Sequence, residues 1–208
     1  MLMPLAAAAV VLVVLFINEL WWRKRRPHSE LSRKFVHIVV GTFIAFWPFL
    51  MNWQQIKLFS LAFVLAVAVS KYFNIFSAIH SVTRPTWGEV CFALSVGVLA
   101  FLAPEPEVYA AALLHMSLAD GLAALVGVRF GLSNRYTVFG HAKSIIGTMA
   151  FFVVSLVILG VYSYVAAAPF TLSLVWLAAG AALLENLAVR GLDNLFVPIL
   201  IAIILPRL

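Results

Sequence analysis

Long apolar runs are the feature of this sequence that most restricts its fold. They cover residues 4–22, 35–51, 56–73, 88–103, 108–128, 145–164, 171–189 and 195–206. A helix of about 20 apolar residues crosses the hydrocarbon core of a bilayer, and a spanning segment has to satisfy its backbone hydrogen bonds internally. We therefore predict an all-α, polytopic integral membrane helical bundle of about seven to eight transmembrane helices. It would form a single domain over residues 1–208.

The composition excludes an ordinary soluble protein. Hydrophobic residues make up 64% of the chain and charged residues 11%, whereas a soluble domain carries about 25% charged residues. The net charge of +6 does not indicate binding to nucleic acid, because the basic residues lie mostly beside the apolar runs, where sorting of loops across the membrane explains them.

The basic residues also predict the orientation. The first apolar run precedes the cluster at 23–26, whereas a signal peptide carries its positive charge first. We therefore interpret residues 4–22 as a retained first span with the N-terminus outside. Alternation then places 12 of the 14 lysines and arginines on the cytoplasmic side, as the positive-inside rule predicts.

Acidic residues gather at the same level. Six lie near the cytoplasmic side or inside that leaflet: Glu19, Glu30, Glu89, Asp120, Glu185 and Asp193. Carboxylates inside a membrane are costly and need a partner or a task. This pattern indicates a polar site at the cytoplasmic boundary.

The segment 30–37 opens the second apolar run. On a helix, Glu30, Arg33 and His37 share one face, which suits a phosphate with Glu30 orienting Arg33. The alternative is a basic collar that snorkels to the interface, with a satisfied histidine. Glu89, at the start of the fourth run, either acts in a site or stabilises the helix dipole.

Asp120 is the strongest functional candidate, because it lies two helical turns inside the membrane. A divalent cation that bridges phosphates would stabilise its ionised form. Small residues at 119, 123, 127 and 131 form a stripe suited to close helix packing.

Two later motifs have both local and functional interpretations. Lys143 suits a phosphate, and Ser144 can cap the sixth run; His141 beside them is interpreted as a loop residue. Gly191 can end the seventh run, and Asp193 or Asn194 can cap the eighth. These local interpretations leave Glu185 unexplained.

The motifs that the sequence lacks exclude several classes of enzyme. The sequence has no nucleotide-binding P-loop, no protein-kinase motif set and no zinc-ligand spacing. Asp120-Gly121 superficially resembles the CDP-alcohol phosphotransferases, but the spaced aspartates of that family are missing.

Taken together, the motifs resemble the membrane kinase family of dolichol kinase, phytol kinase and the CTP-dependent diacylglycerol kinase of yeast. The matching blocks are Glu30–His37, Gly88–Glu89, Ala119–Gly121 with Arg129–Gly131, Lys143–Ser144 with Gly147–Thr148, and Gly191–Asn194 with Val197–Pro198. They occur in family order over about residues 30–198. Two of the blocks also resemble the CDP-diacylglycerol synthases, but Asp193-Asn194 replaces the Asp-Arg-x-Asp ending of those enzymes.

The resemblance implies a compact bacterial lipid-alcohol kinase of the inner membrane. It would transfer the γ-phosphoryl group of CTP, or of another nucleotide, to a polyprenol, a phytol-like alcohol or diacylglycerol. The metal ligands for Mg²⁺ would be Asp120, Glu185, Asp193 and Asn194. The phosphate-binding residues would be Arg33, Lys34, Arg129, Lys143 and Ser144. The alcohol's proton would pass to His37, Glu89 or a carboxylate on the metal side such as Asp120.

We expect the lipid to enter from the inner leaflet along the small-residue stripe. Two alternatives stay open. One is a cytidylyltransferase that makes a CDP-lipid, and the other is a non-enzymatic transporter of an anionic lipid or metabolite.

Overall fold

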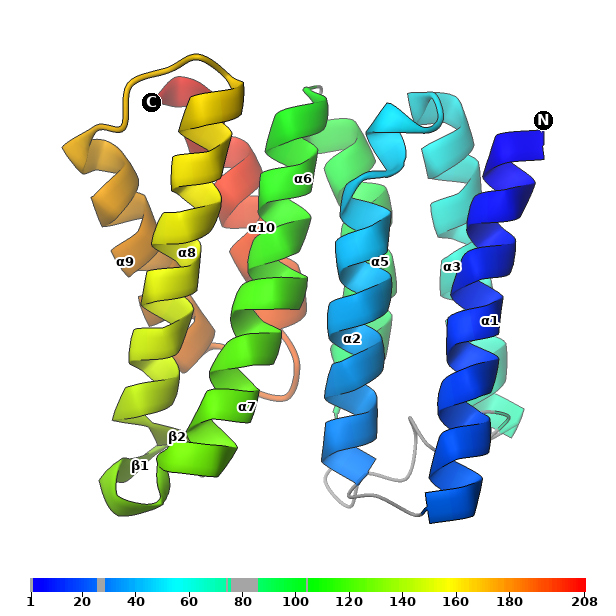
Figure 1. The fold of residues 1–208 in the computed structure, drawn as a ribbon, viewed down its shortest axis with the longest axis horizontal. Coiled ribbons are helices and arrows are strands. Elements are labelled where there is room, and N and C mark those ends of the chain that lie inside the picture. Colours follow the sequence, from blue (N-terminus) through cyan, green and yellow to red (C-terminus); the bar gives the residue numbers. More distant parts are fainter. Residues whose placement is uncertain (1, 26–28, 74, 76–85, 104) are drawn as a thin grey trace.

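A computed structural model describes residues 2–25, 29–73, 75, 86–103 and 105–208, and in residues 2, 25 and 29–32 the backbone alone. The helices of these segments are α1 (Leu2–Arg25), α2 (Ser29–Ala45), α3 (Trp53–Phe73), α5 (Gly88–Leu102), α6 (Pro106–Leu114), α7 (Asp120–Phe130), α8 (Ile145–Val165), α9 (Leu172–Leu187) and α10 (Asp193–Ile204). They stand side by side with both termini at one end (Figure 1). Each predicted apolar run corresponds to one helical rod, so the all-α bundle is confirmed.

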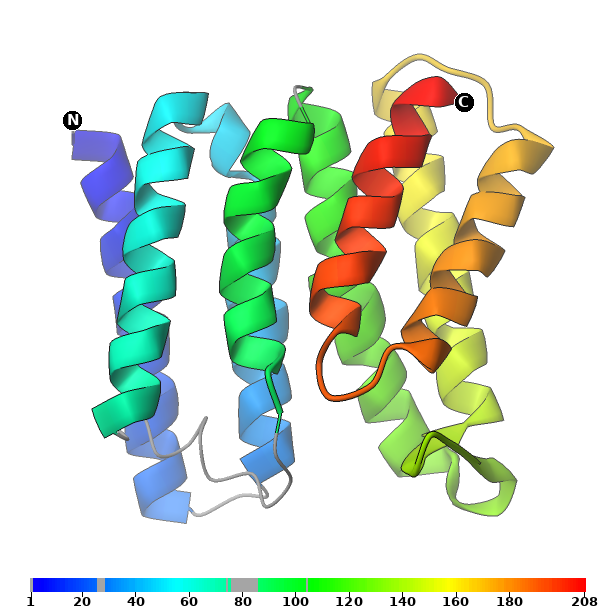
Figure 2. The ribbon, with the colours of Figure 1, turned by 180° about the vertical axis from the view of Figure 1, so that it is seen from behind.

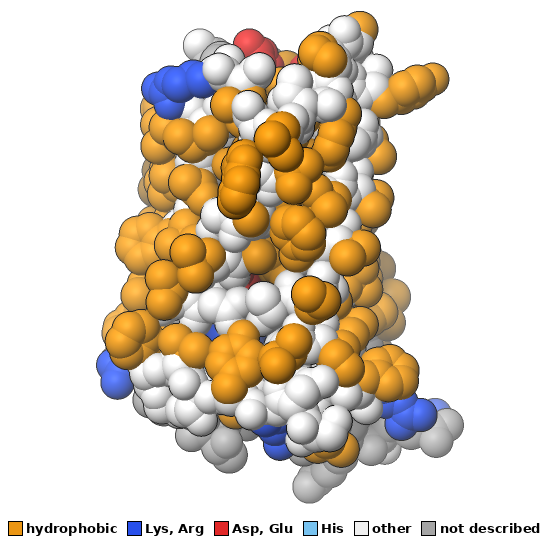
Figure 3. Space-filling view, turned by 90° about the vertical axis from the view of Figure 1, so that its left-hand side faces the viewer, with side chains coloured by type: hydrophobic (Ala, Val, Ile, Leu, Met, Phe, Trp, Pro, Cys, Tyr) orange, Lys and Arg blue, Asp and Glu red, His pale blue; other side chains and the backbone are white. Residues whose placement is uncertain are grey.

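Several of these rods are long and apolar enough to cross a membrane. Within the described segments they are Met3–Lys24, Trp53–Phe73, Pro106–Phe130 and Ile145–Val165, and α5 and α9 are shorter apolar helices. Hydrophobic side chains cover the middle of the face formed by α8 and α9 (Figure 3). A surface of this kind is stable in lipid and not in water. The chain is a helical membrane protein.

Local hydrogen bonds fix where two of the helices begin. At the start of α3, Asn52 Oδ1 accepts from Gln55 N at 3.0 Å, and Gln55 Oε1 accepts from Asn52 N at 3.1 Å. This reciprocal pair satisfies two free backbone donors. At the start of α8, Ser144 Oγ accepts from Gly147 N at 3.1 Å. The predicted cap at Ser144 is confirmed.

A β-hairpin joins α7 to α8, which the sequence interpretation did not include. Strands β1 (Arg135–Val138) and β2 (His141–Ser144) pair antiparallel through a two-residue turn. Phe139 and Gly140 have φ values of 46° and 79°, as the turn type that suits hairpins requires. His141 therefore lies on a strand, and its interpretation as a loop residue was wrong.

The loop between α9 and α10 differs from its prediction at both ends. α9 ends at Leu187, four residues before Gly191, and the residue that precedes α10 is Leu192, with no side-chain cap. The predicted roles of Gly191 as the helix stop and of Asp193 or Asn194 as the cap were therefore wrong. The loop turns well inside the molecule instead of at its end (Figures 1 and 2). This position carries the start of α10 into the interior.

The small-residue stripe on α7 packs against α8. A Cβ atom added to Gly147 on α8 would lie 3.1 Å from the carbonyl oxygen of Ala123 and 3.4 Å from Gly127 Cα. The packing interpretation of the stripe is thus confirmed. The expected lipid route along it was wrong, because α8 covers the stripe.

Candidate active site

Three carboxylates from three helices meet in the interior of the bundle. Asp120 begins α7, Glu185 lies in the last turn of α9, and Asp193 begins α10. One oxygen of each lies within 4.8 Å of the others, and Asp120 and Glu185 are only 6% and 7% exposed. Three anions this close, two of them buried, repel one another unless cations neutralise them. Hard oxygen ligands in such a cluster fit a divalent cation such as Mg²⁺.

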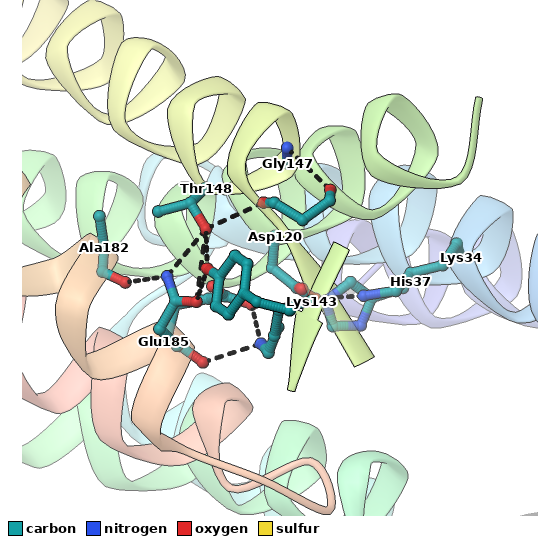
Figure 4. Close-up of polar contacts among 11 residues, drawn as sticks. Lys34, His37, Asp120, Lys143, Gly147, Thr148, Ala182 and Glu185 are labelled. Carbon is teal, nitrogen blue, oxygen red and sulfur yellow. Dashed lines mark hydrogen bonds and ion pairs between the residues drawn. The ribbon is translucent and has the colours of Figure 1, made fainter. Parts of the chain in front are cut away.

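Two lysines partly neutralise the cluster (Figure 4). Lys34 Nζ lies 2.6 Å from Asp120 Oδ2. Lys143 Nζ forms an ion pair with Glu185 and also donates to the Glu185 carbonyl oxygen at 3.0 Å. Burial lowers the pKa of Lys143, but the surrounding carboxylates, Glu185 first and then Asp193 and Asp120, together outweigh burial, so the pKa of this lysine lies above its ordinary value. Asp193 has no hydrogen bond or ion pair to any residue that the structure describes.

A proline positions Asn194 beside these carboxylates. Pro198 lies inside α10 and has no N–H, so it frees the carbonyl oxygen four residues earlier, which is that of Asn194. Ser95 Oγ donates to this oxygen, and Asn194 Nδ2 donates to the Gly88 carbonyl oxygen at 2.9 Å. Asn194 is 3% exposed, and its Oδ1 has no partner among the described residues. A buried acceptor of this kind is costly without a ligand.

The segments around Gly88 and Gly191 contact each other closely. Gly191 has a φ of +88°, and a Cβ atom there would lie 2.4 Å from both Gly88 N and Gly88 Cα. Trp87 N donates to the Arg190 carbonyl oxygen at 2.9 Å. Only glycine fits this combination of backbone conformation and close approach. The contact fixes the loop that carries Asp193 and Asn194.

His37 contacts the carboxylate cluster from α2. Its Nε2 lies 2.8 Å from the Met116 carbonyl oxygen and 3.3 Å from Asp120 Oδ2. Both neighbours are acceptors, so a proton lies on Nε2, and in the neutral ring Nδ1 is then an acceptor. Met116 belongs to a π-helical turn (His115–Ala119) immediately before Asp120, and single π-turns occur often at functional sites.

A polar cavity of about 430 Å³ opens beside the carboxylates. Its lining combines these acids with several basic residues from α2, the hairpin and the α9–α10 loop. The basic residues are Arg33, Lys34, Arg135, His141, Lys143 and Arg190. This mixture is the one expected for a polyanion bound with a cation.

A second cavity of about 320 Å³ is apolar and lies among α1, α2, α3 and α5. Its polar side chains lie at the end nearest the carboxylates and include His37, Ser70 and Glu89. Arg33 and Asn194 line both cavities. The two cavities therefore lie next to each other, with these two residues in both linings.

The structure brings most of the predicted site residues together, with exceptions. Arg129 is exposed at the end of α7, with its guanidinium 6.0 Å from the Phe130 ring centre, and does not line either cavity. Ser144 lines the polar cavity while it caps α8. Glu89 lies at the apolar groove, with an oxygen 3.9 Å from Lys71 Nζ. The predicted contact between Glu30 and Arg33 is not described, because the side chain of Glu30 lies outside the described part of the structure.

The sequence interpretation missed a hydrogen-bonded cluster next to Glu185. Tyr136 on β1 contacts Thr148 Oγ1 at 2.7 Å and donates to Asn186 Oδ1. Asn186 Nδ2 donates in turn to Thr148 Oγ1 at 3.0 Å. These contacts hold the hairpin over the polar cavity. Asn186 and Thr148 are polar residues inside apolar runs. Polar groups in a membrane span need partners, so their positions could have indicated this cluster from the sequence.

The fold and the site define a membrane-embedded protein in which a carboxylate cluster lies where a polar cavity meets an apolar one. Comparison with known proteins identifies its relatives. The chain is 35% identical over 204 residues to the phytol kinase of Synechocystis sp., and the match covers 93% of this chain and 85% of that protein. The chain therefore belongs to the phytol kinase family, as the motifs predicted. No family model and no solved structure matches the chain.

Proposed function

We propose that this protein is a Mg²⁺-dependent lipid-alcohol kinase that transfers the γ-phosphoryl group of CTP to phytol or a related alcohol. The observation that carries the proposal is the junction of the two cavities at Arg33 and Asn194. A charged donor in one cavity and a lipid hydroxyl in the other would meet there. The relative's name supports the acceptor class, and the family resemblance supports CTP.

The polar cavity would hold the nucleotide with its cation. Asp120, Glu185 and Asp193 would bind Mg²⁺, and the unpartnered Oδ1 of Asn194 is a further oxygen ligand. When bound, the cation would neutralise charge on the phosphates. It would also compete for the carboxylates that now pair with Lys34 and Lys143, so that both lysines could turn to phosphate oxygens.

The acceptor hydroxyl would approach from the apolar cavity. His37 lines that cavity, and its Nε2 is directed to two acceptors. Nδ1 is then the nitrogen that can accept the proton of the attacking alcohol. Arg33 at the junction would stabilise the phosphoryl group during transfer, since a guanidinium matches phosphate geometry.

The basic residues support a cytoplasmic site. The start of α2, the end of α3 and the hairpin lie at the end of the bundle opposite the N-terminus (Figure 1), and they carry Lys34, Lys71 and Lys143. The positive-inside rule places such an end in the cytoplasm. The protein would thus lie in a bacterial inner membrane with its N-terminus outside and would take CTP from the cytoplasm.

A double-label assay tests the function. Purified protein in detergent is incubated with phytol, Mg²⁺ and CTP labelled at either the γ or the α phosphate. The Asp120→Asn variant, assayed in the same way, is the control. We expect γ-label, and no α-label, in the lipid phase, and none of either with the control. Transfer of α-label would show a cytidylyltransferase instead. Absence of turnover together with lipid flux in liposomes would show a transporter.

A further inference from the structure

The apolar cavity has the shape of a site for one hydrocarbon chain. Its lining on α2 runs from Arg33 through Val36, Val40 and Ile44 to Trp47 just beyond the helix. The first and last of these positions are 14 residues apart, or about 21 Å at 1.5 Å per residue. The cavity therefore extends farther than one leaflet of a bilayer, which is about 15 Å of hydrocarbon.

This cavity is polar at one end and apolar along the rest of its length. The lower end, near the carboxylates, has Arg33, His37 and Glu89, whereas the lining beyond Val40 is apolar. α1 and α3 supply most of the remaining apolar lining of this cavity. A ligand that fits has one polar head and one long apolar tail.

Aromatic side chains line the far end. Trp47 is 3% exposed and packs edge-on against Phe59 of α3, with ring centres 6.1 Å apart. Both residues line the cavity. A buried aromatic pair is a rigid stop for a chain that enters from the polar end.

We propose that this groove is the acceptor site and that the Trp47–Phe59 pair limits the length of the acceptor chain. The inference rests on the proposed kinase function and assigns its chain-length limit to these two residues. A cavity of about 320 Å³ lies at the low end of ligand sites and holds one chain, so diacylglycerol and long polyprenols are poor acceptors.

Substitutions on α3 test the length limit, because Ala62 and Ala66 line the groove between Phe59 and the polar end. Ala62→Phe should shift the preferred n-alkanol to a shorter chain, and Ala66→Phe should shift it further. Each should raise the phytol KM at least about tenfold, the effect of losing roughly 1.4 kcal/mol of binding. Phe59→Ala should shift the preference to longer chains. Ala68→Phe, on the same helix but outside the groove lining, is the matched control.

The KM for CTP should stay unchanged in all four variants, which separates an effect on the groove from misfolding. An unchanged chain-length profile in the three groove variants would overturn the inference. Wild-type preference for diacylglycerol over phytol would overturn it as well.

A second measurement keeps this inference distinct from the kinase proposal. A long-chain alcohol with a diazirine at its tail is bound without nucleotide, photolysed and mapped by mass spectrometry. We expect adducts near Trp47 and Phe59, whether or not the protein transfers phosphate. Adducts elsewhere in the bundle would overturn the groove assignment. Groove adducts without any phosphoryl transfer would reject the kinase function alone.

Discussion

Lys34 Nζ on α2 lies 2.6 Å from Asp120 Oδ2 at the start of α7, and both side chains are less than 10% exposed. The pair joins two helices whose residues are far apart in the sequence. Breaking a buried pair by removing one partner leaves an uncompensated charge, at a cost of about 3–5 kcal/mol. The same carboxylate belongs to the proposed cation site. Asp120 is therefore expected to contribute both to the stability of the fold and to catalysis.

The Asp120→Asn variant should lose both properties. We expect phosphoryl transfer to fall about 100-fold or more, the scale on which removal of a preorganised electrostatic group acts. The melting temperature should fall too, because the Lys34 ammonium loses its partner. Adding Lys34→Met should restore much of the melting temperature while activity stays low. Wild-type activity in folded Asp120→Asn would contradict the metal role.

Lys143→Ala should weaken nucleotide binding. The lysine lines the polar cavity and would turn from Glu185 to a phosphate. Hydrogen bonds to charged groups contribute about 1.5–3 kcal/mol, so the KM for CTP should rise about tenfold or more, with little change in the KM for the alcohol. Lys57→Ala is the control, because Lys57 of α3 lies over the Phe101 ring of α5 and lines neither cavity. Equal KM values in wild type and Lys143→Ala would remove this residue from the phosphate site.

Gly191→Ala should displace the loop that carries Asp193 and Asn194. A Cβ atom there meets Gly88 at 2.4 Å, at a φ of +88°. Gly140→Ala is a matched control, since Gly140 has a φ of +79° and nothing within 4 Å of an added Cβ. Both variants carry the backbone strain of about 1–2 kcal/mol, and only Gly191→Ala adds the clash. We expect loss of activity with Gly191→Ala alone; equal losses would show that backbone strain, not contact with Gly88, is what matters.

Mg²⁺ should stabilise the folded protein in the absence of nucleotide. A ligand that binds only the native state raises its stability with concentration, so the melting temperature should rise from EDTA to millimolar Mg²⁺. Asp193→Asn should abolish most of this rise, because it removes a carboxylate of the cluster. Glu105→Gln, at the opposite end of the bundle, should leave the rise unchanged. A rise that is the same in all three proteins would place the cation elsewhere.

Hydrophobic patterning was sufficient to predict the bundle. Each apolar run became a helix because a chain in lipid has to form its backbone hydrogen bonds within the segment. Local chemistry also predicted the Ser144 cap and the close packing at Gly127 correctly. The motifs likewise predicted the family to which the chain belongs.

The local sequence pattern could not predict that the α9–α10 loop lies in the interior of the bundle. The sequence predicted that Gly191 ends one helix and that Asp193 caps the next, because glycine and aspartate are common at those positions. Their observed positions depend on contacts with Gly88 and Ser95, about 100 residues away in the sequence. Such contacts are properties of the packed molecule.

The sequence by itself determined a helical membrane protein with acids and bases at one level, because burial of apolar runs and the cost of buried charge act along the chain. It also singled out Asp120 and Glu185 as carboxylates in need of partners. Only the tertiary structure decided those partners, Lys34 and Lys143, and placed Arg33 and Asn194 in the linings of both the polar cavity and the apolar groove. The reason is geometric: which helix faces meet depends on how all the helices pack together.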